Sequence, residues 1–269
     1  MAKSTKKSHK IYLDFASSAT KGGANAGAIH ELGLVEKRKL EKARLAVADI
    51  LGAHSDEIIF TSGATESNNL AIFGIFGCWT PGNQVSNTRG SHIVTTNIEH
   101  ASVLEVCKFL EKSRQAKVTY VEVEKNGIVS PDKIKKALRP DTVLVSVMYA
   151  NNEIGTIQPI REIAKEIRHY NRQFGKKIIF HTDATQAINY LPIKAQKLGV
   201  DLMSFNAAKI YGPKGVGVLF KKRSIRLLPI MHGGDQEFGI RPGTEDPVGI
   251  SSQAESLQIA EAMKDKESK

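Results

Sequence analysis

One lysine, Lys209, stands out by its position as a candidate nucleophile. It comes four residues after a short apolar run, 200–205, and is followed by closely spaced glycines and a proline at 212–217. The apolar run predicts a buried strand and the glycines predict backbone bends, so we expect the lysine just beyond a strand end. An amine held in a partly desolvated pocket has a lowered pKa and attacks carbonyl groups. The alternative is an ordinary solvated loop lysine, and other segments must decide between the two.

Three further polar positions follow apolar runs of the same kind. Thr65 stands among small and hydroxyl residues between a strand pattern and a helix pattern, where exposed backbone N–H groups and the helix dipole predict a phosphate site. His100 follows a second run, in a strand-to-helix turn. Asp183 ends a third, and a buried carboxylate there requires a cationic partner. Taken singly, the first two have plainer interpretations: a helix N-cap with nothing bound and a histidine without function.

The elements that position these groups alternate between strand and helix patterns. We expect an α/β fold, a three-layer sandwich with a mostly parallel sheet, in which the carboxyl ends of the strands gather at one edge. Helix patterns occur at 40–51, 101–112 and 160–170, the first as an amphipathic helix lying on the sheet and ended by Gly52. The expected strands are 10–15, 57–61, 92–96, 118–123, 142–148, 177–181 and 200–205.

A pocket that joins these groups has a specific chemical interpretation. Pyridoxal phosphate needs a lysine for its imine, a helix N-terminus for its phosphate, a carboxylate at its pyridine nitrogen and a flat partner over its ring. Lys209, Thr65, Asp183 and His100 can fill these roles in turn. A nicotinamide or nucleotide enzyme would not use the lysine and the carboxylate together, and no phosphate-loop or dinucleotide glycine pattern follows a strand here.

Composition excludes several other classes. The 269 residues carry a net charge of +10, but Lys and Arg are scattered apart from the first ten residues, so no nucleic-acid groove is predicted. Cys78 and Cys107 form neither a disulfide framework nor a metal-ligand spacing, so we expect no metal. With no apolar leader and no run of about 18 apolar residues, we expect a cytoplasmic protein without a membrane partner. Cys107 falls on the apolar face of a predicted helix and is expected in the core.

The chain resembles a cysteine desulfurase of the class V aminotransferase group, the NifS/IscS-like enzymes of iron–sulfur cluster assembly. Seven ordered segments along most of the chain carry the resemblance. They are YLD with Ala16 (12–16), FTSGATESNNLAI (60–72), EHASVL (99–104), NNEIGTIQPI (151–160), HTDATQA (181–187), DLMSFNAAKIYGPKGVG (201–217) and HGGDQEFGIRPGTED (232–246).

The resemblance implies the large domain of a type I pyridoxal-phosphate-dependent transferase, acting as a homodimer on L-cysteine. It implies alanine as product and an enzyme persulfide that passes sulfur to acceptor or iron–sulfur scaffold proteins. It also implies the following roles: Lys209 as the imine lysine; His100 as ring-stacking residue and acid/base catalyst; Asp183 and Gln186 on the pyridine nitrogen and phenolic oxygen; Asn152 near the substrate; Ala64, Thr65 and Asn206 at the phosphate; and Thr244 at the phosphate of a partner subunit.

The chain also departs from the family pattern. Ala208 stands where the family has a phosphate-contacting histidine, and Asn206 where a serine is usual. We expect a basic tail (1–10), a cofactor-binding domain (11–247) and a helix (248–269) leading to a small C-terminal domain, with the sulfur-accepting cysteine, that is absent here. The chain is then the cofactor domain of a truncated, split or degenerate desulfurase-like protein. Two alternatives stay open: another class V lyase or aminotransferase, such as a selenocysteine lyase, and a non-catalytic scaffold that keeps the fold.

Overall fold

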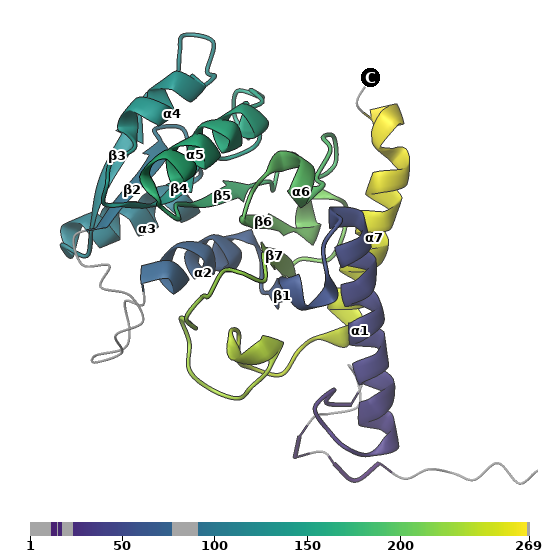
Figure 1. Cartoon of the computed structure of the whole chain (residues 1–269). Coiled ribbons are helices and arrows are strands. Elements are labelled where there is room, and N and C mark those ends of the chain that lie inside the picture. Colours follow the sequence, from purple (N-terminus) through teal and green to yellow (C-terminus); the bar gives the residue numbers. More distant parts are fainter. Residues whose placement is uncertain (1–11, 15, 18–23, 77–90, 268–269) are drawn as a thin grey trace, which may run out of the picture.

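A computed structural model describes residues 12–14, 16–17, 24–76 and 91–267. Its centre is a seven-stranded sheet, drawn with the surrounding helices in Figure 1. The strands lie in the order β1 (Ile58–Thr61), β7 (Gly217–Lys221), β6 (Leu202–Asn206), β5 (Ile179–Asp183), β4 (Thr142–Ser146), β2 (Ser91–Thr96) and β3 (Ala116–Val121).

All strands except β7 run in the same direction. β3, β2, β4, β5 and β6 pair in parallel, and β7 is antiparallel to both β6 and β1, so β1 points the same way as the parallel set. The carboxyl ends of β1, β2, β4, β5 and β6 therefore meet at one edge. β3 lies at the border of the sheet. Sequence patterns gave no strand for β7.

The helices connect the strands and cover both faces of the sheet. They are α1 (Glu31–Leu51), α2 (Ala64–Phe76), α3 (Ala101–Lys112), α4 (Pro131–Ala137), α5 (Ile160–Phe174), α6 (Ala195–Leu198) and α7 (Pro247–Glu267), with short 3₁₀ turns η2 (Ser55–Glu57), η3 (Ala207–Lys209) and η4 (Glu237–Gly239). Within α3, Cys107 is fully buried, as predicted. Cys78 and the tail 1–10 lie outside the described residues, and the domain division at 247/248 stays a prediction.

The three layers follow from the alternation of apolar side chains along the strands. In β2, Ile93 packs into a cluster with residues of α2 and α3, while the next residue, Val94, packs into a cluster with residues of α4 and α5. In β4, Leu144 and Val145 divide in the same way. Figure 1 shows α4 and α5 on one side of these strands and α3 on the other. The expected sandwich with a mostly parallel sheet is confirmed.

One expectation about the start of the chain was wrong. Residues 12–14, the described part of the first predicted strand, are in no strand; there the Asp14 carboxylate accepts a hydrogen bond from the Ser17 hydroxyl and lies 3.0 Å from His30 Nε2. Helix α1 ends at Gly52 in the left-handed conformation (φ 64°), as predicted, and its buried face packs into one cluster with residues of β1, β6, β7 and α7. Figure 1 shows α1 and α7 side by side at the β1–β7 end of the molecule.

Candidate functional site

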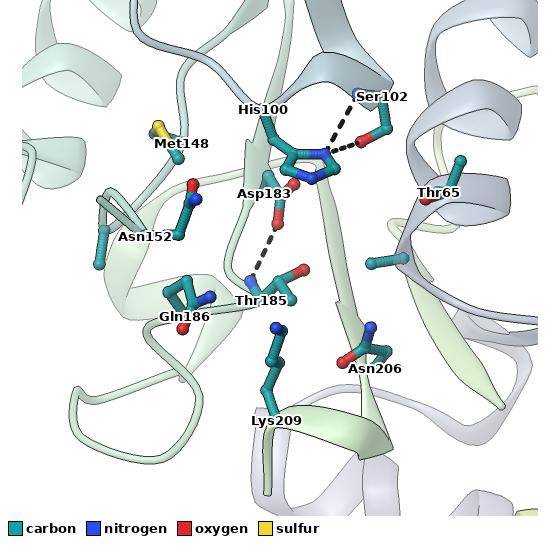
Figure 2. Close-up of a pocket in the computed structure, with 12 residues that line it drawn as sticks. Thr65, His100, Ser102, Met148, Asn152, Asp183, Thr185, Gln186, Asn206 and Lys209 are labelled. Carbon is teal, nitrogen blue, oxygen red and sulfur yellow. Dashed lines mark hydrogen bonds between the residues drawn. The ribbon is translucent and has the colours of Figure 1, made fainter. Parts of the chain in front are cut away.

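A cavity of about 260 Å³ opens at the carboxyl edge of the sheet, where five strands end. Figure 2 shows its side chains converging from separate elements. Eight of the nine residues predicted for the site line it: Ala64, Thr65, His100, Asn152, Asp183, Gln186, Asn206 and Lys209. The other lining residues are Ser102, Met148, Ala150 and Thr185.

Lys209 ends the 3₁₀ turn η3, directly after β6. The backbone N–H groups of Ile210 and Gly212 both donate to the carbonyl of Ala207, at 3.0 and 2.9 Å, which turns the chain back after the lysine. In Figure 2 its side chain extends into the pocket toward Asp183 and the turn that follows β5. The lysine is exposed, however, so the partial desolvation expected from sequence is not found. Its position, rather than burial of the amine, singles it out.

Asp183 is the last residue of β5, and its carboxylate is buried. Oδ1 accepts a hydrogen bond from the backbone N–H of Thr185 at 2.9 Å, and Oδ2 accepts one from Asn68 Nδ2 at 2.7 Å. Among the described residues no salt bridge reaches this carboxylate. It is therefore stabilised by N–H donors alone, which leaves it able to pair with a cationic group of a ligand.

His100 is the N-cap residue of α3. Its Nδ1 accepts a hydrogen bond from the backbone N–H of Ser102 at 3.1 Å and lies 2.8 Å from the hydroxyl of the same serine. Figure 2 shows the imidazole on one side of the pocket and Lys209 pointing toward it from the other. A planar group bound between them would meet the ring of His100 and the amine of Lys209 together.

The first turn of α2 forms the third wall of the pocket. Ala64 and Thr65 are the first two residues of this helix, whose opening N–H groups have no acceptor within the helix and attract anions. Gly63, just before it, has φ +153°, and a Cβ on Gly217 of β7 would lie 2.5 Å from the Gly63 carbonyl carbon. A glycine at 217 is needed for the two backbones to meet this closely, and the positive φ favours a glycine at 63. This contact fixes the start of the helix against the sheet.

Two polar atoms in the pocket wall have no partner. Asn206 Oδ1, at the end of β6, and Thr185 Oγ1, in the turn after β5, are buried and make no hydrogen bond in the structure. Buried polar atoms are normally paired, so unpaired ones mark places where a ligand or water completes the site. A phosphorylated, partly polar ligand at the start of α2 fits this arrangement.

Two loops of the site are held together by a carboxyl group that sequence reasoning missed. Glu99 Oε1 accepts hydrogen bonds from Thr96 Oγ1 at 2.6 Å and from the backbone N–H of Met148 at 2.9 Å, and Asn151 Nδ2 donates to the carbonyl of Ile98 at 2.9 Å. Burial raises the pKa of Glu99 to about 8, and the charge of nearby Asp183 adds to this shift. Near neutral pH Glu99 is therefore mainly protonated. It joins the loop that carries His100 to the loop of Met148.

A buried histidine precedes Asp183 on the same strand. His181, two residues earlier on β5, lies between the hydroxyls of Ser146 and Ser204, at 2.8 and 3.0 Å. Burial lowers the pKa of His181 to about 4, so the ring is neutral at pH 7. The motif containing His181 was noted in the sequence, but neither its role nor those of Ser102, Thr185 and Asn68 was recognised. The signal available for Ser102 was its place two residues after the N-cap histidine.

Thr244, predicted for a partner's site, does not line this pocket. It is exposed in the segment between η4 and α7. The segment is held near α2 by an ion pair between Arg241 Nε and Glu66 Oε1 at 2.9 Å, and Glu66 also accepts from the N–H of Ser62. Ala208 is likewise exposed and outside the lining. The role expected for Thr244 at a partner subunit's phosphate stays a prediction.

Across residues 12–14, 16–17, 24–76 and 91–267, no group of three His, Cys, Asp or Glu side chains is arranged to hold a metal ion. In the same ranges, no helix combines the length and apolar character needed to cross a membrane.

Comparisons with known proteins agree with the geometry. The family profile described as aminotransferase class-V matches residues 1–264. A cysteine desulfurase IscS of Dictyoglomus turgidum is 46% identical over 243 residues, covering 90% of this chain and 58% of that relative. Among solved structures, a NifS-like protein has a TM-score of 0.83 at 38% identity, covering 90% of this chain and 63% of the other. SspA in complex with cysteine has a TM-score of 0.80 at 36% identity, with coverage of 89% and 65%. The chain spans less than two thirds of each of these proteins.

Proposed function

The chain belongs to the class V aminotransferase family, and we propose that it is the pyridoxal-phosphate-binding part of a cysteine desulfurase. The observation that carries the proposal is the convergence of Lys209, Asp183, His100 and the first turn of α2 on one pocket. Identity of 46% to a cysteine desulfurase supports the same assignment. The proposed reaction converts L-cysteine to L-alanine and leaves the sulfur as a persulfide on a cysteine.

The pocket offers each part of the cofactor a suitable partner. The N–H groups of Ala64 and Thr65 and the amide of Asn206 would hold the phosphate, and the Asp183 carboxylate would pair with the protonated pyridine nitrogen. The amine of Lys209 is the nucleophile that an aldehyde requires. When bound, the cofactor supplies an electron sink for the charge that develops at the substrate α-carbon.

The remaining lining residues would orient the cofactor and the amino acid. Gln186 is proposed for the phenolic oxygen, and Asn152, with its amide in the pocket, for the substrate. His100 would cover the ring and exclude water from one face of it. A solved relative described in complex with cysteine supports cysteine as the substrate class.

The persulfide cysteine and the substrate-carboxylate group are not among the residues of this pocket. Cys107 is fully buried, and burial raises its pKa to about 12, which makes it a poor sulfur acceptor. We therefore propose that the acceptor cysteine comes from another segment or chain. A homodimer in which Thr244 reaches the partner's phosphate site, transfer to iron–sulfur scaffold or acceptor proteins, and a cytoplasmic location complete the proposal.

The test is covalent trapping of the cofactor. The chain is mixed with pyridoxal phosphate, reduced with borohydride and digested, and the modified peptide is located by mass spectrometry. We expect one adduct, on Lys209. Lys214, five residues later, serves as a control because it is also exposed but lies outside the pocket. An adduct spread over surface lysines, or none at all, would contradict the proposal.

A further inference from the structure

A single buried asparagine joins the two groups that would lie on the cofactor ring. Asn68 is on α2 and has no exposed surface. Its Nδ2 donates to Asp183 Oδ2 at 2.7 Å and to Ser102 Oγ at 2.8 Å. Ser102 Oγ in turn lies 2.8 Å from His100 Nδ1. Four side chains from α2, α3 and β5 thus form one connected network around the pocket.

The direction of each hydrogen bond in this network is determined. An amide nitrogen carries two hydrogens, and Asn68 uses one for Asp183 and one for Ser102. Because Ser102 Oγ accepts from Asn68, its own hydrogen is available for His100 Nδ1. The backbone N–H of Ser102 also points to Nδ1, at 3.1 Å, so Nδ1 must be an acceptor. The neutral imidazole then carries its proton on Nε2, the nitrogen that faces the pocket in Figure 2.

Packing alone does not account for an asparagine at this position. Its carbonyl oxygen, Oδ1, is buried without a hydrogen-bond partner, which is costly for an amide in a protein interior. Only the amide nitrogen is used, and both of its hydrogens go to groups of the pocket. The site thus depends on the Nδ2 donor of Asn68, although burying its unpaired Oδ1 lowers stability.

We propose that Asn68 is a positioning residue that holds the Asp183 carboxylate and, through Ser102, keeps His100 as its Nε2–H tautomer. This inference rests on the proposed function in that Asp183 and His100 matter because of the cofactor between them. In the network as built, His100 presents an N–H donor to the pocket. Taking up a proton at Nε2 requires the Nδ1–H tautomer, which would direct its hydrogen at the N–H of Ser102. The imidazole therefore orients and donates a hydrogen bond before any proton transfer by it.

The cofactor arm of the test uses Asn68→Asp, which keeps size and acceptor oxygens but removes the donor. The matched control is Asn97→Asp. Asn97 lies in the turn before His100, is exposed, and uses only its Oδ1, which accepts from the Val123 N–H at 3.3 Å and survives the change.

We expect N68D to weaken binding of pyridoxal phosphate at least about tenfold, because a second carboxyl replaces the donor beside Asp183. We also expect N68D to shift the pH midpoint of the bound-cofactor absorbance. N97D should change the affinity by less than about twofold and leave the pH midpoint at its wild-type value. Wild-type affinity and pH midpoint in folded N68D would overturn the proposal.

The second arm needs no cofactor and no change at Asn68. Nitrogen NMR of the histidine rings in the unliganded wild-type chain, with His100→Gln to assign the signal, reports which ring nitrogen is protonated. We expect Nε2–H for His100. In Ser102→Ala the backbone N–H still donates to Nδ1, so the tautomer should be kept while the Nδ1 resonance moves toward that of a more weakly hydrogen-bonded nitrogen. Ser102→Thr, which restores the hydroxyl, should return the Nδ1 resonance to its wild-type position. Protonation at Nδ1 in the wild type would overturn the proposal even if N68D fails to fold. If wild type binds no cofactor but the NMR result holds, the proposed function fails and the network stands.

Discussion

One cavity lies at the carboxyl ends of the parallel strands and another at their amino ends, and the candidate site is the smaller of the two. A groove of about 630 Å³ lies at the amino edge, lined by residues near the start of β5 and β6 and the end of β7; we call it the amino-edge groove. Its polar groups serve the backbone: Asp201 Oδ2 accepts from the Phe180 N–H at 3.1 Å, and Glu57 Oε1 from the Arg223 N–H at 2.8 Å. In the pocket at the carboxyl edge, Asn206 Oδ1 and Thr185 Oγ1 have no partner. The unpaired polar atoms in its wall, rather than its volume, distinguish the candidate site from the amino-edge groove.

The largest expected difference between the two edges is in covalent cofactor binding. Lys209→Ala should abolish the visible absorbance of lysine-bound pyridoxal phosphate, because the pocket then has no amine to attack the aldehyde. Lys177→Ala, which removes a lysine lining the amino-edge groove, should leave that absorbance at its wild-type level. Equal losses in the two variants, measured by absorbance titration, would contradict the comparison.

A matched pair of aspartates compares the two edges by charge. Asp183→Asn keeps the size of the side chain but removes the charge that would face the pyridine nitrogen, so cofactor affinity should fall about 100-fold. Asp201→Asn in the amino-edge groove should leave affinity unchanged and cost only about 1 kcal/mol of unfolding free energy, since a neutral oxygen still accepts from Phe180. Fluorescence titration and urea unfolding measure the two quantities. The comparison fails if the larger loss of affinity belongs to D201N.

The pH dependence of stability tests the buried carboxyl at the site edge. The folded-state pKa of Glu99 is raised to about 8, whereas the pKa of a glutamate in an unfolded chain is about 4.3. The folded protein therefore holds a proton that the unfolded chain has released. The stabilisation is complete below about pH 4.3 and is lost as pH rises toward 8. Between about pH 6.5 and 8 the unfolding free energy should fall by on the order of 2 kcal/mol in wild type.

Glu99→Gln provides the control for that decline. A glutamine keeps an oxygen for Thr96 and Met148 but cannot ionise, so its unfolding free energy should be nearly flat over the same range. His181 does not interfere, because its folded pKa is lowered to about 4; its stabilisation is complete above about pH 6.5 and is lost as pH falls toward 4. Parallel curves for wild type and E99Q from pH 6.5 to 8 would rule out a protonated Glu99.

The smallest effect is expected from an exposed ion pair of the amino-edge groove. Lys222 Nζ lies 3.3 Å from Asp201 Oδ1, and the lysine is largely solvated. Lys222→Ala should lower the unfolding free energy by less than about 1 kcal/mol, with no change in cofactor affinity. Thermal unfolding with and without pyridoxal phosphate measures both. A loss of several kcal/mol would show that this groove has a role that the comparison misses.

The fold was predictable because its strands are apolar and regularly spaced. Runs such as 142–148 and 177–181 identify buried parallel strands, and the polar residue after each run lies at the shared edge as expected. β7 was missed because Gly217 and the preceding turn residues obscure its start, and it becomes a strand only by pairing with β6 and β1. The packing of α1 along α7 was not predicted, because an amphipathic pattern shows that one face of a helix is covered but not by which elements.

The candidate site was predictable at strand ends and hidden elsewhere. Lys209 and Asp183 were recognised because their residue types are unusual next to buried strands. Asn68 and Glu99 were not, because their roles depend on contacts across 115 and 49 positions of the chain, with Asp183 and Met148 respectively. Local patterns do not carry such contacts. The exposure of Lys209 could not be predicted from local patterns either, since it depends on how η3 is placed at the pocket.

The central claim is that Lys209 and Asp183 bind opposite parts of one cofactor. A crystal structure of the chain with pyridoxal phosphate tests this most directly. We predict density continuous with Lys209 Nζ, the pyridine nitrogen within hydrogen-bond distance of Asp183, and the phosphate at the first turn of α2. Density for the cofactor in the amino-edge groove, or at Lys209 with the ring turned away from Asp183, would contradict the account.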